Sequence, residues 1–405
     1  MQPVNTKHIK EEKKIPNLRF PGFEGGWEIQ PLKKISKFLD NKRIPLSESE
    51  RQKRKGPYPY YGASGIIDNI DDYIFDGEYV LLGEDGANIV NRSTALAFVV
   101  SGKIWVNNHA HIIEAYGSTH FLAESLERIR YEKYNTGTAQ PKLNADVCKK
   151  IPIALPSLPE QKKIASFLSA VDQKIQQLTR KKELLELYKK GVMQKIFPPV
   201  GGQAPEIRFR NENGNNFPDW EEKRLGELAE IRRGASPRPI SDPKWFDPSS
   251  KIGWVRISDV TRSNKYLDKT EQYLSEEGIR KSRLVEKGNM IMSICATIGK
   301  SIYTNFKVCI HDGFVVFENL KANKEYLYYF LDKIQLSWYK YGQPGTQVNL
   351  NTNIVGNENI PYPSFPEQKR IAGFLSSIDE KIEFVKNNIT QTQKFKKGLL
   401  QQMFV

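Results

Sequence analysis

The sequence is poor in cysteine and has no long apolar run. It contains 3 cysteines in 405 residues, which is too few for a disulfide framework. No apolar stretch approaches the ~20 residues that a bilayer-spanning helix needs. The opening residues, MQPVNTKHIKEEKK, lack the hydrophobic segment of a secretory signal. We therefore expect a cytoplasmic protein with no membrane contact, and its length leaves room for two or three domains.

The motifs of common DNA-modifying enzymes are also missing. An adenine methyltransferase would need an Asn/Asp-Pro-Pro-aromatic loop to hold an extruded base, but the only Pro-Pro pair lies in FPPV at 197–200. An ATP-binding loop needs G-x-x-x-x-G-K-S/T, and the stretch ATIGKS fails because Ile294 occupies the first glycine position. A metal nuclease could be argued from PDWEEK at 218–223, but the matching GGWEIQ in the first half favours a structural role.

The sequence gives little support for a metal site or a nucleophilic cysteine. His109 and His111 are two residues apart, as are Cys309 and His311, and neither spacing belongs to a zinc-binding motif. Cys295 lies in an apolar, strand-like run and is predicted to be a core residue. We therefore predict no catalytic residue, no metal ligand and no cofactor in this chain. A DNA-modifying enzyme in its own right is the alternative.

The chain is strongly basic. It has 61 Lys+Arg against 47 Asp+Glu, a formal net charge of +14 and a pI near 9.3. This balance favours a polyanionic partner such as nucleic acid, although such a charge can also serve solubility alone. The segments RQKRK at 51–55 and RRGASPRP at 232–239 place basic residues in Gly-, Ser- and Pro-rich loops of both halves. That placement favours DNA.

One segment occurs twice, at an offset of 207 residues. PSLPEQKKIASFLSAVDQKI at 156–175 matches PSFPEQKRIAGFLSSIDEKI at 363–382 at 14 of 20 positions. The duplication extends to the start and the end of each half, whereas the interiors at 36–137 and 232–344 show almost no similarity. The further matches are NLRFPGFEGGWEIQPLKKI (17–35) with EIRFRNENGNNFPDWEEKRLGELAEI (206–231), and TAQPKLN (138–144) with GTQVNLN (345–351). The chain is therefore two copies of one frame around two different interiors.

Each copy of the repeated segment forms the start of a predicted long helix. Pro159 and Pro366 suit a first-turn position, and the glutamate after each of them favours the helix dipole. Apolar residues then recur every seven residues for about five heptads, which keeps one stripe facing a partner helix. The clearest stripe positions are Ile164, Leu168, Val171, Ile175 and Leu178 in the first copy and Ile371, Leu375, Ile378, Ile382 and Val385 in the second. We expect the two stripes to bury each other; separate packing of each helix on its own domain is the alternative.

The two interiors carry the composition of mixed α/β domains with much strand. Runs of β-branched and aromatic residues, cut by Gly, Asp and Asn, occur at 72–90 and 95–108 and again at 287–306 and 308–320. The loops around them are rich in aromatic residues, amides and basic residues. Amides, Lys and Arg are the residue types that read base edges.

Together these segments resemble the specificity subunit of a Type I restriction–modification system. The resemblance covers nearly the whole chain. It is carried by LRFPGFEGGWE and its second copy, YYGASGIIDNIDDYIFDGEYVLLGEDGA, GNMIMSICATIGKS, IHDGFVVF, GTAQPKLN, GTQVNLN and both PEQK helices. It implies an α+β fold with an internal pseudo-twofold repeat, in which two mixed α/β target-recognition domains are joined by two long helices that form an antiparallel coiled coil. The expected parts are a first domain at 1–154, a first helix at 155–197, a linker and second domain at 198–361, and a second helix at 362–405.

The resemblance also implies a function and partners. The chain is expected to be a non-catalytic DNA-recognition subunit, with each domain reading one half of a bipartite site on double-stranded DNA. Two methyltransferase subunits are expected to bind it, and restriction and translocase subunits to join through that core. S-adenosylmethionine, ATP and magnesium are then expected on those partner subunits.

Candidate DNA contacts come from the basic and polar loops. The residues predicted to touch phosphate are Lys42, Arg43, Arg51, Lys53 and Arg54 in the first half and Arg232, Arg233 and Arg238 in the second. The residues predicted to read bases are Tyr60, Tyr61, Ser64, Gln140 and Lys142, then Ser236, Arg256, Ser258, Gln347 and Asn349. A solvated surface is the alternative role for each of them, so the set carries more weight than any member.

Overall fold

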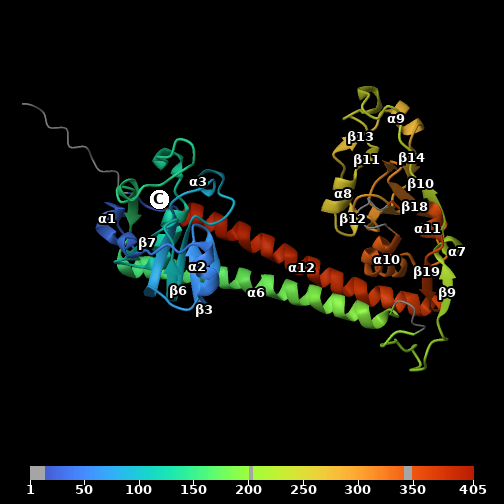
Figure 1. Cartoon of the computed structure of the whole chain (residues 1–405), viewed down its shortest axis with the longest axis horizontal. Coiled ribbons are helices and arrows are strands. Elements are labelled where there is room, and N and C mark those ends of the chain that lie inside the picture. Colours follow the sequence, from blue (N-terminus) through green and yellow to red (C-terminus); the bar gives the residue numbers. More distant parts are fainter. Residues whose placement is uncertain (1–13, 200–203, 342–348) are drawn as a thin grey trace, which may run out of the picture. The chain divides into compact units, whose positions relative to one another are not determined.

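The computed structural model describes residues 14–199, 204–341 and 349–405 (Figure 1). The chain forms two compact units, one from Met1–Thr179 with Asn387–Val405 and the other from Arg180–Lys386. Across the described ranges, no helix is both long and apolar enough to span a membrane.

The first unit is built around a sheet in the order β2-β7-β5-β6-β3-β4. All neighbouring strands pair antiparallel except β3 and β6, which are parallel. Its elements are β1 (Glu28–Pro31), α1 (Leu32–Ile35), β2 (Ser36–Phe38), α2 (Glu48–Lys53), β3 (Lys55–Gly62), β4 (Gly65–Ile70), β5 (Phe75–Gly83), α3 (Asn88–Asn91), β6 (Ala97–Val106), β7 (Ala110–Ala115), α4 (Thr119–Glu127), α5 (Ala145–Cys148) and β8 (Pro152–Leu155), with 3₁₀ turns at Asp40–Lys42 and Tyr131–Tyr134.

Both faces of this sheet are buried along its central strand. Val80 and Leu82 of β5 pack in one cluster with Leu122 and Leu126 of α4. Leu81, which points the other way, packs in a second cluster with residues of β6 and β7. Side chains alternate along a strand, so a run that is apolar at every position fits a strand covered on both sides.

The second unit has two larger sheets and one separate strand pair, β9 with β19. The orders of the two larger sheets are β10-β18-β15-β16-β12 and β13-β11-β17-β14. Its elements are β9 (Glu221–Arg224), α7 (Leu225–Leu228), β10 (Glu230–Arg233), β11 (Gly253–Val255), α8 (Ile257–Arg262), β12 (Tyr266–Leu267), β13 (Gln272–Tyr273), α9 (Glu276–Arg280), β14 (Arg283–Val285), β15 (Met290–Ser293), β16 (Ser301–Thr304), β17 (Val308–Ile310), β18 (Phe314–Glu318), α10 (Lys324–Lys333), α11 (Thr352–Gly356) and β19 (Asn359–Tyr362), with 3₁₀ turns at Pro243–Trp245 and Gln335–Tyr341.

The central strand of the larger sheet is again covered on both faces. Met290 and Met292 of β15 pack in one cluster with Leu327 of α10, whereas Ile291 packs in a separate cluster with Val316 of β18. This arrangement repeats that of β5 in the first unit. The prediction of two mixed α/β domains is confirmed.

The duplicated frame is visible as one strand pair in each unit. In the first, β1 pairs antiparallel with β8, so that the entrance of the half lies beside its exit. In the second, β9 pairs antiparallel with β19 in the same way. The turn after each entrance strand makes an equivalent bond: Leu32 N donates to Ile151 O and Leu225 N donates to Glu358 O, both at 2.9 Å.

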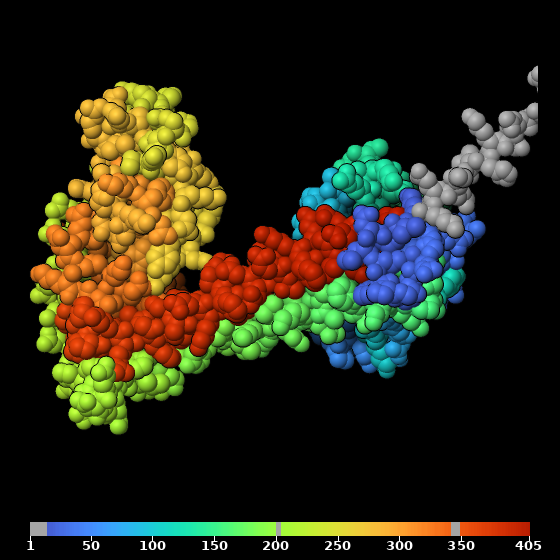
Figure 2. Space-filling model, turned by 180° about the vertical axis from the view of Figure 1, so that it is seen from behind, coloured from blue at the N-terminus to red at the C-terminus, as the bar shows by residue number. Residues whose placement is uncertain are grey.

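Two long helices follow the exit strands, α6 (Leu158–Ile196) and α12 (Phe365–Met403). In the first unit, the start of α6 packs against the end of α12, where Leu168 and Val171 share a cluster with Leu399 and Met403 (Figures 1 and 2). In the second unit, the end of α6 packs against the start of α12, where Ile196 shares a cluster with residues of α12. The two helices therefore run antiparallel.

The predicted stripe residues lie inward. Ile164, Leu168, Val171, Leu178, Ile371, Leu375, Ile378 and Val385 are all buried, and Ile175 and Ile382 are partly buried against the same clusters. Lysines also occupy two equivalent positions of the heptad pattern, and each meets an acid from the other helix. Lys396 contacts Asp172 at 2.8 Å, and Lys189 contacts Asp379 at 2.7 Å. The helices bury each other, rather than packing separately.

Candidate nucleic-acid interface

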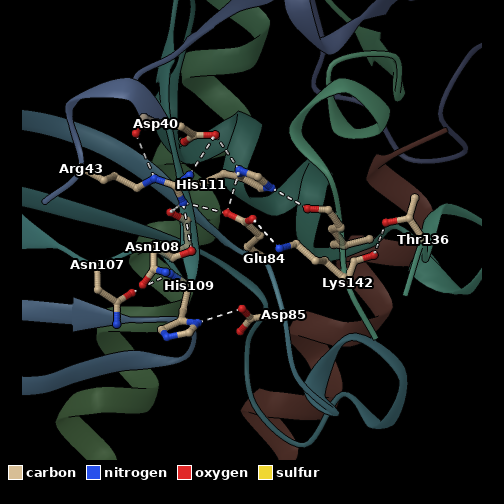
Figure 3. Close-up of polar contacts among 12 residues, drawn as sticks. Asp40, Arg43, Glu84, Asp85, Asn107, Asn108, His109, His111, Thr136 and Lys142 are labelled. Atoms are coloured by element: carbon tan, nitrogen blue, oxygen red, sulfur yellow. Dashed lines mark hydrogen bonds and ion pairs between the residues drawn. The ribbon is translucent and has the colours of Figure 1, made fainter. Parts of the chain in front are cut away.

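Four segments meet at one end of the strands of the six-stranded sheet in the first unit, and we call this end the loop edge. They are the β3–β4 turn, the residues after β5, the β6–β7 turn and the exit segment at 135–143. Figure 3 shows residues of three of the segments: those after β5, in the β6–β7 turn and in the exit segment. Asn107 N donates to Tyr61 O at 3.0 Å, and Glu84 N donates to His109 O at 2.8 Å. Leu143 N donates to Glu84 O at 2.7 Å, which ties the exit segment to the end of β5. Loops held in this way by a sheet are common binding sites.

Charged side chains are buried beneath these loops. His111 lies on β7 with its side chain 1% exposed. Its Nδ1 is 2.7 Å from an oxygen of Asp40, and its Nε2 is 2.8 Å from Leu143 O. Both neighbours are acceptors, so both ring nitrogens donate and the ring is an imidazolium. Burial would lower the pKa of His111, but hydrogen bonding to Asp40 and the nearby sulfur of Cys148 outweigh it and raise the pKa to about 10.

Glu84 connects this buried group to the surface. One carboxylate oxygen is 2.7 Å from Nη1 of Arg43, and the other is 3.4 Å from Nζ of Lys142. Arg43 also donates to the carbonyl of Ala110 at 2.9 Å, and its side chain is 14% exposed. Arg43 thus holds the loops from below, whereas Lys142 is 48% exposed beside Glu84 and Asp85.

Several predicted contacts of the first half take part in internal bonds. Arg51 pairs with Asp68 at 3.4 Å and lies over the ring of Tyr60. Arg54 pairs with Asp71 at 2.9 Å and lies over a tryptophan ring. Tyr60 is 1% exposed, and its hydroxyl accepts from Leu46 N at 2.9 Å. These three side chains make internal contacts that stabilise the domain, and their contacts with DNA stay predictions.

Other predicted residues of the first half are accessible. Lys42, Lys53, Ser64 and Gln140 are exposed, and Tyr61 is partly buried against Phe98. Tyr61 and Ser64 belong to the loop edge, because Tyr61 O accepts from the β6–β7 turn. Lys42 follows Asp40 in the turn that also carries Arg43. Their roles as DNA contacts stay predictions.

Three predicted residues of the second unit converge on one aspartate, two at its carboxylate and one at its backbone carbonyl. Asp312 accepts from the hydroxyl of Ser236 at 2.7 Å and from Arg238 at 3.3 Å. Its backbone carbonyl accepts from Arg233 at 2.8 Å. Hydrogen bonding to Ser236 lowers the pKa of Asp312 against an opposing effect of burial. The sequence placed the serine and the arginines in one basic loop but did not identify the acid that holds them, because Asp312 is 76 residues from Ser236.

The remaining predicted residues of the second half are more dispersed. Arg232 pairs with Glu230 and Glu318 on the sheet, at 2.9 and 3.0 Å. Arg256 caps α8, which also carries Ser258, and donates to Gln272 at 2.7 Å. Asn349 is exposed, and Gln347 lies outside the described residues.

Cys295 and His311, near Asp312 in the second unit, do not form an activated thiol–imidazole pair. Burial raises the pKa of the Cys295 thiol and lowers the pKa of the His311 imidazole. Both shifts favour the neutral forms, whereas a catalytic pair needs a thiolate. Among the described residues no group of three His, Cys, Asp or Glu is arranged to hold a metal ion.

The glutamate of each PEQ motif has a role that sequence inspection missed. Glu160 is 1% exposed and accepts two hydrogen bonds from Arg19, both at 2.7 Å. Glu367 accepts from Arg208 at 3.1 and 2.8 Å and from Trp220 Nε1 at 3.1 Å. These acids were predicted to favour the helix dipole, and both lie in the first turn of their helices. Each one also ties its helix to the entrance of its own half.

The glutamine after each of these glutamates ties the start of its long helix to the interior of its own half. Gln161 Oε1 accepts from Ser118 N, the cap of α4, at 3.2 Å, and Gln161 Nε2 donates to Pro156 O at 2.9 Å. Gln368 Oε1 accepts from Asn323 N, the cap of α10, at 2.8 Å. The identity of both motifs could have suggested a shared contact, but the partners are too distant in sequence to be named.

Comparison with known proteins agrees with this architecture. The chain is 26% identical, over an alignment of 442 positions, to the type I restriction enzyme MjaVIII specificity subunit of Methanocaldococcus jannaschii, covering 98% of this chain and 96% of that one. It is 27% identical to a provisionally named type I restriction enzyme specificity subunit of Haemophilus influenzae, covering 90% and 89%. The crystal structure of a type I restriction–modification S subunit from M. genitalium has the same fold, with a TM-score of 0.62, 15% identity and coverage of 97% and 99%.

A family model gives the assignment. The model described as the type I restriction modification DNA specificity domain matches residues 24–187 and again 218–393. These two matches span most of both halves. The chain belongs to the type I restriction–modification DNA specificity family and carries two of its domains.

Proposed function

We propose that each domain of this specificity subunit reads one half of a bipartite DNA site and so directs its partner subunits to that site. The observation that supports this most is that the two domains share backbone hydrogen bonds at their loops but carry different side chains there. A pair of readers with independent preferences needs the same framework and different side chains at the tips.

The shared backbone extends into the loop edge. Glu84 N donates to His109 O at 2.8 Å in the first domain, and Ile294 N donates to Gly313 O at 2.9 Å in the second. Leu143 N then donates to Glu84 O at 2.7 Å, and Leu350 N donates to Ile294 O at 2.9 Å. At matching places, the first domain therefore has an acid and a histidine where the second has an isoleucine and a glycine.

The partners and cofactors follow from the same proposal. A repeated frame offers two equivalent surfaces, which suits two copies of a methyltransferase subunit, and restriction and translocase subunits would join through that core. S-adenosylmethionine, ATP and magnesium would be held by those partners, in the cytoplasm. The basic balance of +14 favours DNA as the ligand of the loops.

The test is to map methylated bases in the genome of a host that carries this chain with its cognate methyltransferase. We expect a motif of two short defined sequences separated by a fixed number of unspecified base pairs. A continuous motif would contradict the two-reader proposal. The absence of any new methylation in cells that contain the assembled complex would contradict it as well.

A further inference from the structure

The loop edge of the first domain carries an exposed acid–histidine pair that was not among the residues predicted to contact DNA. His109 Nδ1 is 2.8 Å from an oxygen of Asp85 (Figure 3). The histidine side chain is 50% exposed and the aspartate side chain 24%. His109 N also donates to the side-chain oxygen of Asn107 at 2.8 Å, and Asn107 is buried. The backbone of this turn is therefore held, and the imidazole orientation is set by Asp85.

The orientation of the ring determines what it offers. A carboxylate oxygen accepts, so Nδ1 is the nitrogen that carries the proton. In the neutral ring Nε2 is then an acceptor, and it has no hydrogen-bond partner among the described residues. The amino groups of adenine and cytosine are donors in the major groove, and an acceptor side chain can read them. Lys142 lies beside this pair, because its backbone forms an antiparallel β-bridge with that of Asp85. Its side chain is 48% exposed and its ammonium is 3.4 Å from Glu84.

We propose that His109 is a base-reading residue of the first half-site and that Asp85 is its positioning residue. The proposal rests on the two-reader function proposed above and adds the residues that determine one base pair of it. The matching place in the second domain supports this assignment, because Gly313 and Cys295 occupy it there. If the shared frame needed an acid–histidine pair for its structure, both domains would have one. A pair that reads one particular base is expected in one domain only.

The experiment uses the full chain assembled with its methyltransferase and measures methylation of a DNA library randomised at each position of the wild-type motif. The variants are His109→Ala, Asp85→Ala and the double variant. His120→Ala is the matched control, because His120 is 49% exposed and pairs with Glu78 at 3.4 Å, elsewhere on the same domain. Co-purification with the methyltransferase shows that each variant is folded.

We expect discrimination at one base pair of one half-motif to fall about tenfold in His109→Ala, with the other half-motif unchanged. Asp85→Ala should relax the same base pair, and the double variant should be no more relaxed than His109→Ala alone, since the acid acts through the histidine. The control should keep the wild-type motif. His109→Leu serves if the alanine variant does not assemble, because it keeps side-chain volume but has no hydrogen-bonding group.

Two results would overturn the inference. One is an assembled His109 variant with an unchanged motif. The other is a uniform loss of methylation at every sequence, which would indicate a phosphate contact or a structural role. Failure of the two-reader proposal is distinguishable, because the wild-type chain in the same assay would then show a motif that is not bipartite.

Discussion

Replacing Glu160 with glutamine should loosen the first domain while leaving the second intact. The Glu160 carboxylate is almost fully buried and accepts two bonds of 2.7 Å from Arg19. Glutamine keeps the volume but removes the charge, so the guanidinium loses its counter-ion in a site where its own exposure is 15%. Removing one partner of a buried pair costs about 3 kcal/mol, which is about a hundredfold in an opening equilibrium.

Hydrogen exchange measures this opening strand by strand. In Glu160→Gln, the amides of β1 and β8 should exchange about a hundredfold faster, and those of β9 and β19 should exchange as in the wild type. Glu367→Gln should give the reverse pattern, because Glu367 holds the entrance of the second half through Arg208 and Trp220. The duplicated frame thus supplies an internal control in each molecule.

A double replacement separates the charge from the packing. Arg19→Met with Glu160→Met removes both charges and leaves apolar volume, which is often neutral for stability, so exchange should return most of the way to wild type. The reasoning would be refuted if Glu160→Gln left β1 and β8 as protected as before. It would equally be refuted if both strand pairs opened to the same extent.

Three further predictions concern pH, the helix pair and salt. The pKa of His111 is raised from 6.5 to about 10 in the folded state. The protonated ring therefore stabilises the fold fully below about pH 6.5, and this contribution is lost as the pH rises through about 10. The thermal stability of the first unit should fall over that window, and His111→Gln should remove the dependence. Leu168→Lys places an unpaired charge in a buried contact, at a cost of several kcal/mol, and should abolish co-purification with the methyltransferase; normal assembly would contradict the packing described for α6. Binding of the assembled complex to its DNA should weaken with salt, with a log–log slope near −5 for ~6 phosphate contacts, and a flat dependence would argue against the role given to the basic loops.

Periodic features of the sequence were sufficient to predict the framework. The long helices follow from a seven-residue apolar repeat, and the prolines at 198 and 199 mark the end of the first one. Lys189 and Lys396 interrupt the apolar pattern, and their acidic partners come from the other helix. A pattern along one helix indicates which face is buried, but it does not name the residue opposite.

The site was less predictable because its bonds connect distant segments. The sequence placed Arg51 and Arg54 in a basic loop, but Arg51 lies in α2 and Arg54 directly after it. Their partners, Asp68 and Asp71, come from β4 and the residue after β4, beyond the intervening strand β3. The buried group of Asp40, Glu84 and His111 joins residues up to 71 positions apart. Composition shows that such charges exist, whereas their pairing depends on strand order.

The most direct test of two independent readers is to exchange one interior. Residues 36–143 would be replaced by the equivalent interior of a family member with a different half-site, which moves the exit segment together with the acid that contacts Lys142. The entrance strand, the exit strand and both long helices would stay. Mapping of methylated bases should show one half of the motif changed, the other half kept and the spacing unaltered. A change in both half-motifs would contradict the account.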